Sequence, residues 1–311
     1  MVGDSTSNPL VAAQYRIVSA LLQASVGAII RGLGQDIPIG ELVFARSAFG
    51  VAILLVFHAA RGEISEALGT KYPLRHVGRS ASGVSSSIAY FAALVYLPLV
   101  DVTVLAYSSP IIAVLFAAIL LGERVRAYRW SAVCIGFFGV LIIVWPYLNS
   151  ARLFGSVAGI GVGLALGSSI GSALSAVQIR RLVKTEHTSA IVFYFYAASM
   201  LVAAFSLPFW FVVPSSTQSL ALLAAAVFNV LSQTCTTQSY RYAPASSVVI
   251  LDYTTIIFAF VLGYFFLGEL PEYQVYIGGS IIAAASIFIV LRERYLNKTI
   301  ALAAMETRDR V

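Results

Sequence analysis

The chain has 311 residues, of which 59% are hydrophobic and 11% are charged, and its mean hydropathy is +0.87. Soluble domains carry about 25% charged residues, so this composition excludes a soluble globular protein and indicates a polytopic membrane protein. The net charge of +6 does not indicate nucleic-acid binding, because the basic residues stand at the ends of apolar segments. The two cysteines, Cys134 and Cys235, both lie within apolar runs, so the sequence suggests neither a disulfide framework nor a metal cluster.

Ten apolar stretches approach the roughly 20 residues that a helix needs to cross a bilayer. In chain order they are 17–34, 38–58, 78–96, 100–121, 130–145, 157–179, 189–210, 220–243, 245–267 and 275–291. The sequence therefore predicts an all-α polytopic membrane protein with ten transmembrane helices. No basic segment precedes the first stretch, so we expect a retained helix there instead of a cleaved signal peptide.

The positions of lysine and arginine predict the orientation of these spans. Most of the 20 lysine and arginine residues fall on one side of the predicted membrane, whereas Arg31 and Arg152 fall on the other and Arg46 lies within the second span. Loops rich in these residues face the cytoplasm. We therefore expect a multi-pass protein of the cell inner membrane in which 1–16 and 292–311 are cytoplasmic tails.

Residues 96–123 recur 146 positions later as 242–269, and ten of the aligned residues are identical. Both copies begin with Tyr-x-Pro and end with Leu-Gly-Glu, which indicates an internal duplication with repeats at 17–148 and 149–291. Each repeat holds five spans, an odd number, so the second repeat must cross the membrane upside down. Two inverted halves related by an in-plane pseudo-twofold axis are the architecture of a secondary transporter, with its site near the midplane.

The Tyr-x-Pro turn, Pro110 within the fourth span, the Leu-Gly-Glu end and the glycines Gly136 and Gly139 of the next span resemble the EamA-type repeat. Proteins with this repeat are ten-helix members of the drug/metabolite transporter superfamily, and the resemblance covers about 17–291. Arg46 also matches a tendency of the family. The second copy departs from the pattern, since Ile256 stands where Pro110 does.

The segment 238–246 and the following Asp252 to Thr255 are similar to the branch that exports amino acids and other metabolites. The resemblance implies a secondary transporter that exports amino acids, aromatic or other apolar ones included, by alternating access. Import or exchange of another metabolite, such as a nucleotide-derived or sugar compound, and export of drugs or organic cations stay open, because residues do not reveal direction.

The same pattern disfavours other classes of protein. No G-x-x-x-x-G-K-[ST] loop is present, so nothing indicates ATP use. An intramembrane enzyme is disfavoured because no histidine lies in the interior of a span. We expect no cofactor, a small-molecule substrate and the lipid bilayer as partners, no nucleic acid, and function as a monomer.

Several spans carry polar side chains at helical spacing, which places them on one face of each helix. They are Asn229, Gln233, Thr236 and Tyr240 in the eighth span, Ser82, Ser86 and Tyr90 in the third, Ser168 and Ser172 in the sixth, and Gln23 in the first. Polar side chains that face lipid are costly, so we expect these to face inward. They either form hydrogen bonds between helices or line a shared substrate cavity.

Tyr107 and Tyr253 occupy equivalent positions in the two copies, so we expect them to approach each other across the pseudo-axis. With Tyr90 they predict an aromatic pocket with hydroxyl groups, suited to an apolar or aromatic solute, and packing in the core is the alternative. Pro110 leaves one carbonyl without its helical partner and can break the fourth span near the midplane.

The sixth span carries Gly159, Gly163, Gly167 and Gly171 at intervals of four. This ridge predicts close helix packing, or a smooth surface along which the halves move. Residues 167–171 also match the hydrolase pattern G-x-S-x-G, but that pattern requires a strand-to-helix turn and a histidine partner, so we reject a nucleophile here.

Asp252 and Arg46 are predicted to lie within the membrane at different depths, so a direct pair requires Arg46 to reach inward. For Asp252 we hypothesise that it binds a cationic group of the solute or carries a coupling proton, with a structural role in a polar network as the alternative. Glu123 and Glu269 are predicted to cap or anchor the ends of helices.

Overall fold

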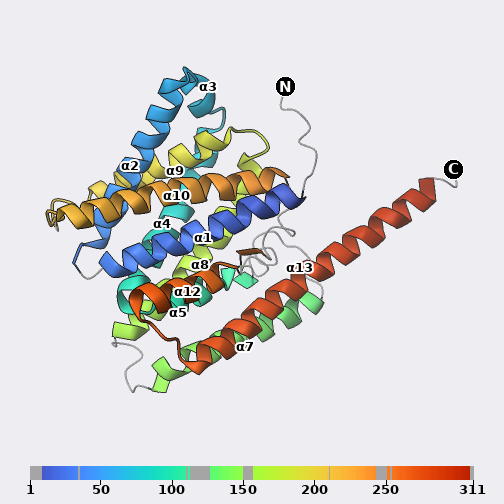
Figure 1. Ribbon diagram of the computed structural model, residues 1–311. Coiled ribbons are helices and arrows are strands. Elements are labelled where there is room, and N and C mark those ends of the chain that lie inside the picture. The colour runs from blue at the N-terminus through green and yellow to red at the C-terminus, as the bar shows by residue number, and fades with distance from the viewer. Residues whose placement is uncertain are drawn as a thin grey trace.

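The structure is a computed structural model that describes residues 9–33, 36–109, 111–112, 127–149, 157–209, 211–242, 251–252 and 254–308. These residues form helices and no strand, which confirms the predicted all-α class. Each of the ten predicted stretches coincides at least in part with a helix. The two halves of the chain form one helical bundle (Figure 1).

The helices of the first half are α1 (Pro9–Leu33), α2 (Ile39–Ala60), the short α3 (Ile64–Leu68), α4 (Pro73–Tyr96), α5 (Leu99–Ala106) and α7 (Ala127–Asn149). Those of the second half are α8 (Val157–Leu182), α9 (Thr188–Ala204), α10 (Ser216–Tyr242), α12 (Thr254–Leu267) and α13 (Tyr273–Arg308). Within the described residues, four helices are long and apolar enough to cross a membrane, namely α1, α2, α8 and α10.

Two helices are longer than the apolar stretches that predicted them. Helix α1 begins at Pro9, eight residues before the predicted span, and α13 continues to Arg308, well past 291. Figure 1 shows the C-terminal part of α13 extending beyond its neighbour α7. The extension of α13 begins with charged and polar helix formers, whereas that of α1 begins with the apolar Leu10 to Ala13 before Gln14 and Arg16. Backbone hydrogen bonding therefore continues beyond the apolar stretches that mark the membrane layer.

The pairs of helices that pack together are symmetric under exchange of the two halves of the chain. Helix α1 packs on α10, and α4 packs on α8, so the first span meets the eighth and the third meets the sixth. Exchange of the halves converts one of these pairs into the other. The pairs α2 with α9, α5 with α12 and α7 with α13 each convert into themselves. A pseudo-twofold axis between inverted repeats produces this pattern.

Hydrogen bonds show the same relation at the level of atoms. Ser86 and Ser232 are equivalent under the shift of 146 residues. Ser86 Oγ on α4 donates to the carbonyl oxygen of Ser168 on α8 at 2.7 Å, and Ser232 Oγ on α10 donates to that of Ser19 on α1 at 3.0 Å. Each serine therefore joins its own helix to the first helix of the opposite half.

We expect Ser86→Ala and Ser232→Ala to lower the apparent melting temperature by similar small amounts. Each removes an interhelical hydrogen bond of a kind that contributes on the order of 1 kcal/mol within a membrane. Thermal unfolding of the purified protein in detergent measures the effect. Ser85→Ala is the control, because this hydroxyl is exposed and bonds only to Ala81 in its own helix. A large loss at one serine and none at the other would contradict their equivalence.

Candidate functional site

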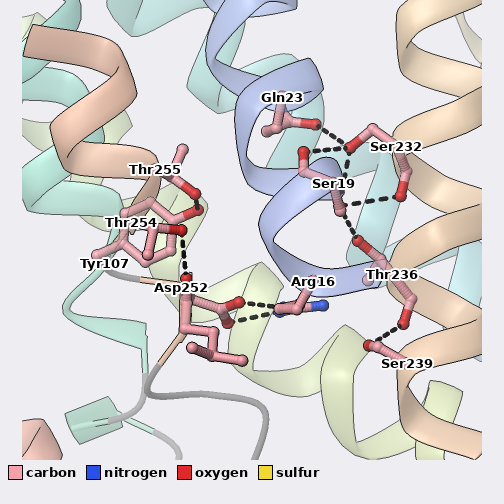
Figure 2. Close-up of polar contacts among 11 residues, drawn as sticks. Arg16, Ser19, Gln23, Tyr107, Ser232, Thr236, Ser239, Asp252, Thr254 and Thr255 are labelled. Atoms are coloured by element: carbon pink, nitrogen blue, oxygen red, sulfur yellow. Dashed lines mark hydrogen bonds and ion pairs between the residues drawn. The ribbon is translucent and has the colours of Figure 1, made fainter. Parts of the chain in front are cut away.

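A polar cluster lies where α1, α10 and the start of α12 meet (Figure 2). Arg16 on α1 donates from Nε and Nη2 to the two carboxylate oxygens of Asp252. The pair is largely buried, with 11% of the Arg16 side chain and 15% of the Asp252 side chain exposed. The Arg16 guanidinium also lies 5.2 Å from the ring centre of Tyr240. Both oxygens of Asp252 are thus held by one guanidinium, the bidentate geometry that binds most strongly.

Arg46 does not pair with Asp252, so that predicted possibility is wrong. The sequence placed Arg16 at the end of a cytoplasmic tail, whereas helix α1 begins at Pro9 and carries Arg16 into the bundle. The charge partner of Asp252 was therefore counted among the loop residues. The proposed roles of Asp252 in binding a solute cation or a proton stay predictions.

Beside this ion pair, hydroxyl groups join α1 to α10. Ser19 Oγ lies 3.1 Å from Ser232 Oγ and also contacts the hydroxyl of Thr236, and Ser232 lies 3.5 Å from Gln23 Oε1. Figure 2 shows this chain of contacts running along one side of α1 from Ser19 to Gln23. Of the predicted stripe of the eighth span, Thr236 therefore faces α1, and Gln23 reaches Ser232, which the stripe did not include.

Two of the three tyrosines of the predicted aromatic pocket, Tyr90 and Tyr107, lie within the described residues. Tyr107 Oη donates to Thr255 Oγ1 at 2.8 Å, which brings the end of α5 to the start of α12 close to Asp252 (Figure 2). Tyr90 Oη lies 3.1 Å from Thr103 Oγ1. Tyr253 and Pro110 lie outside the described residues, so an aromatic pocket that includes both Tyr107 and Tyr253 stays a prediction.

The stripes of the third and sixth spans meet in a second polar seam. Ser86 Oγ lies 2.7 Å from Ser172 Oγ and bonds to the backbone of Ser168, while Gln178 Nε2 donates to Ser82 Oγ at 3.1 Å. In this structure these side chains form hydrogen bonds between helices, the first of the two alternatives that the sequence left open.

The glycines spaced four apart on α8 do not form one packing ridge. A Cβ atom at Gly171 would lie 2.8 Å from both the carbonyl oxygen of Ser82 and Cβ of Ser86, so this glycine lets α4 approach closely. At Gly163 and Gly167 no atom of the described residues lies within 4 Å of the Cβ position. Among the described residues these two glycines therefore have no close helix neighbour, and their predicted packing role stays a prediction.

The reason is the pitch of the helix. Four residues turn about 40° more than a full turn, so Gly159 and Gly171 lie about 120° apart around α8. The face that packs on α4 instead carries Gly161, where a Cβ atom would lie 2.7 Å from the Leu97 side chain, together with the fully buried Ala165. A role of the four glycines in gating stays a prediction.

A second ion pair lies at the opposite end of α1. Arg31 Nε donates to Glu269 Oε1 at 2.7 Å, and Arg31 Nη1 donates to the carbonyl oxygens of Leu94 at 2.7 Å and Val95 at 3.2 Å at the end of α4. Glu269 Oε2 accepts the backbone N–H of Leu99, the first residue of α5, at 2.8 Å. Four helix ends therefore meet at one ion pair.

The Leu-Gly-Glu sequence explains how Glu269 reaches this position. Gly268 has a φ of 66°, a conformation that glycine adopts without strain and that ends α12. The N–H of Glu269 then turns back to the carbonyl oxygen of Gly263 at 2.9 Å. The prediction that Glu269 caps a helix end is confirmed, and the helix it caps is α5. Glu123 lies outside the described residues.

The predicted inward face of the eighth span meets two buried arginines. Asn229 Oδ1 accepts from Arg46 Nη1 at 2.8 Å, and Gln233 Oε1 accepts from Arg79 Nη2 at 3.5 Å. Arg46 is 1% exposed and Arg79 is 3% exposed. Sequence reasoning missed Arg79, which it counted with the cytoplasmic loop. The sequence did contain a pattern that could have identified Arg79 as an inward-facing residue, because Arg79 lies three residues before Ser82 and continues the polar stripe of the third span.

Histidine and acidic groups gather at the predicted cytoplasmic ends of the helices. His76, which precedes the predicted third span, lies 3.8 Å from a carboxylate oxygen of Glu186, and its ring centre lies 4.6 Å from that of Tyr194. Glu186 also accepts the N–H of Lys71 at 3.1 Å, and its carbonyl oxygen accepts Arg241 Nη2 at 2.6 Å. The loop between α8 and α9 is thus fastened to α4 and α10.

We expect this end of the protein to lose stability as the pH falls from about 7 to 5. Burial lowers the pKa of His76 below its ordinary value, with Arg79 acting in the same direction and Glu186 opposing both. The unfolded chain then binds a proton that the folded chain does not, so folding stability is present above a pH of about 6.5 and falls below it.

The change in apparent melting temperature with pH, compared between the wild type and His76→Gln, measures this contribution. We expect the variant to have the shallower pH dependence. Arg75→Gln is the control, because this side chain is exposed and the substitution leaves the buried imidazole of His76 in place. An equally steep pH dependence in His76→Gln and the wild type would contradict the assignment.

Comparison with known proteins identifies a matching family and several relatives of this chain. The family described as "EamA-like transporter family" matches residues 11–145 and 159–291. A protein of Pseudomonas aeruginosa named a pseudopaline exporter is 32% identical over 273 residues, covering 87% of this chain and 93% of the relative. A riboflavin transporter of Rhizobium johnstonii is 25% identical, covering 92% and 93%, and an S-adenosylmethionine uptake transporter of Rickettsia prowazekii is 22% identical, covering 88% and 91%.

One solved crystal structure superposes with a TM-score of 0.64 at 22% sequence identity and covers 92% of this chain and 98% of that chain. At this identity the likeness concerns the fold alone. The fold described above is therefore one that a solved structure shares over nearly its whole length.

Proposed function

Because the chain belongs to the EamA-like transporter family, we propose that it is a secondary transporter that exports small metabolites across the cytoplasmic membrane by alternating access. The proposed substrates are amino acids, aromatic or other apolar ones included, and compounds derived from them. The proposed orientation places both termini in the cytoplasm, as the arginine and lysine distribution predicts.

One observation carries the mechanism, namely that α1 and α12 hold an ion pair at each end of their contact. Arg16 with Asp252 lies toward the predicted cytoplasmic side, and Arg31 with Glu269 lies toward the other side. The order of these residues shows that the two helices run parallel, as the first and ninth spans of an inverted repeat do. Each pair joins the two halves of the chain, so opening on one side requires one pair to separate.

Alternating access requires that the two sides open in turn. In our proposal the external pair separates to release solute outward while the cytoplasmic pair stays closed, and the reverse occurs when solute is taken up from the cytoplasm. The structure has both pairs formed, and therefore corresponds to a state in which α1 and α12 are joined at both ends.

Outward transport is supported by the relative at 32% identity, whose name is that of an exporter. Import is the second candidate, because a relative at 22% identity is named an S-adenosylmethionine uptake transporter, and a relative at 25% identity is named a riboflavin transporter without a stated direction. Both of those solutes carry fused nitrogen rings, so import predicts transport of nucleotide-like compounds instead of simple amino acids.

Flux in proteoliposomes tests the proposal. Purified protein would be reconstituted and supplied with labelled phenylalanine, tryptophan, glutamate, riboflavin or S-adenosylmethionine, each with and without a pH gradient. We expect saturable flux of an amino acid, with empty liposomes as the control. Flux that occurs only with a gradient would support Asp252 as a proton carrier.

The other outcomes separate the candidates. Flux restricted to riboflavin or S-adenosylmethionine would replace the amino-acid proposal with the second candidate. Absence of flux for every compound of the panel would contradict the proposed substrate class. The orientation is tested independently by proteolysis of the C-terminal end of α13 in sealed vesicles, which should cleave only when the cytoplasmic face is accessible.

A further inference from the structure

Two arginines lie close together in the interior of the bundle, between α2, α4, α9 and α10. Arg46 and Arg79 are 1% and 3% exposed, and their amide partners Asn229 and Gln233 are one turn apart on α10. Neither arginine has a carboxylate within 4 Å among the described residues. Within the described part of the chain, two positive charges are therefore held in the same buried region without a matching negative charge.

Aromatic rings hold both guanidinium groups in place. Arg46 lies 4.8 Å from the ring centre of Phe91 and 5.8 Å from that of Tyr196, and Arg79 lies 4.3 Å from that of Phe195. The hydroxyl of Tyr196 also donates to the oxygen of Asn229 that accepts Arg46. Rings and amides fix the planes of the guanidinium groups, but they neutralise neither charge.

Each guanidinium keeps donors without a partner. Nε and Nη2 of Arg46, and Nε and Nη1 of Arg79, are buried and form no hydrogen bond within the described part of the chain. At Arg46 the two donors share one edge of the guanidinium and match the two oxygens of a carboxylate, whereas at Arg79 each free donor can bind one oxygen. A buried cation that keeps unpaired donors and has no counter-charge among the described residues is costly, so the arrangement is suited to a state in which an anion supplies both.

The other buried arginines of the same bundle show the contrast. Arg16 is paired with Asp252 and Arg31 with Glu269, each through Nε and a carboxylate oxygen. At these two positions the chain supplies the acid itself. At Arg46 and Arg79 the described residues supply only neutral amides and aromatic rings.

We propose that Arg46 and Arg79 form the binding site for the carboxylate of the transported solute. This inference rests on the proposed function and narrows it, because it makes a carboxylate the feature that substrates share. Apolar side chains lie next to the site, including the buried Leu54, Val84 and Val230. The remainder of the solute would therefore contact an apolar and aromatic surface.

Binding of a small aromatic anion tests the site without knowledge of the natural solute. Apparent melting temperatures of the purified protein in detergent would be measured with sodium benzoate, with benzamide, and with sodium chloride at equal ionic strength. We expect benzoate alone to raise the melting temperature, because a ligand of the folded state stabilises it and benzamide lacks the charge. An equal response to chloride would assign the site to inorganic anions and overturn the proposal.

Variants locate the binding. Arg79→Gln and Arg46→Gln are expected to abolish the benzoate-induced shift, and Arg79→Lys to reduce it, since lysine keeps the charge without the planar fork. Arg75→Gln, an exposed arginine one turn earlier on α4, is the matched control and should keep the shift. A shift that survives in both Arg79→Gln and Arg46→Gln would overturn the proposal.

A second readout distinguishes ligand binding from a structural role. In the absence of ligand, Arg79→Gln removes an uncompensated buried charge and should leave the melting temperature equal to or above that of the wild type, while carboxylate flux is lost. A structural arginine would give a lower melting temperature instead. Flux of amino acids in the wild type without a benzoate shift would refute this site alone, and a benzoate shift without amino-acid flux would refute the proposed function alone.

Discussion

Glu269→Gln is expected to lower the apparent melting temperature by several degrees and to reduce flux. Both carboxylate oxygens act as acceptors, one for Arg31 Nε and the other for the N–H of Leu99. A glutamine has one oxygen and one NH₂ group, so one of these donors must face another donor. Removing one partner of a buried ion pair costs about 3–5 kcal/mol, and the partial exposure of this pair places it toward the lower end.

Loss of the Arg31–Glu269 ion pair in this variant should also affect the transport cycle. The external pair joins the ends of α1, α4, α5 and α12, so weakening it disfavours the externally closed state, and flux falls when one of two alternating states is depopulated. Glu272→Gln is the matched control, because this side chain lies in the same connection and is exposed. Equal melting temperatures for the Glu269 and Glu272 variants would contradict the role of the external pair.

Asp252→Asn is expected to nearly abolish flux and to destabilise the protein. The asparagine keeps one acceptor for a guanidinium that now binds two carboxylate oxygens, and it leaves Arg16 as an uncompensated cation beside Tyr240. Flux in proteoliposomes and thermal unfolding in detergent measure the two effects. Flux and pH dependence equal to those of the wild type would remove Asp252 both as a solute ligand and as a proton carrier.

The double variant Arg16→Gln with Asp252→Asn separates structure from function. Removing both charges leaves no unpaired ion, so stability should recover relative to Asp252→Asn alone. If Asp252 acts only as the partner of Arg16, flux recovers as well. We expect flux to stay low, because Asp252 is proposed to bind a cationic group of the solute or a coupling proton in addition to Arg16.

The sequence anticipated the interior face of several helices but not what that face contacts. The spacing of Asn229 and Gln233 predicted one inward face of α10, and both side chains do point into the bundle. Their arginine partners lie on α2 and α4, separated from them by more than 150 residues, and no local pattern specifies such a pairing.

The spacing of the α8 glycines likewise did not specify what they contact. A period of four looks like a straight ridge in a sequence, yet a helix of 3.6 residues per turn carries it around the axis. Gly171 lies against α4, whereas at Gly163 and Gly167 no atom of the described residues lies near the Cβ position. Spacing over one or two turns predicts a shared face, and spacing over a whole helix does not.

By itself the sequence determined the class of protein, the number and order of the apolar stretches, and the duplication. These follow from composition, from periodicity and from similarity between two parts of the chain, all of which are local or additive properties. Only the tertiary structure decided which charges meet: Arg16 with Asp252, Arg31 with Glu269, and Arg46 and Arg79 with no acid among the described residues. An ion pair depends on the distance between atoms on different helices, and that distance is set by how the two inverted halves pack.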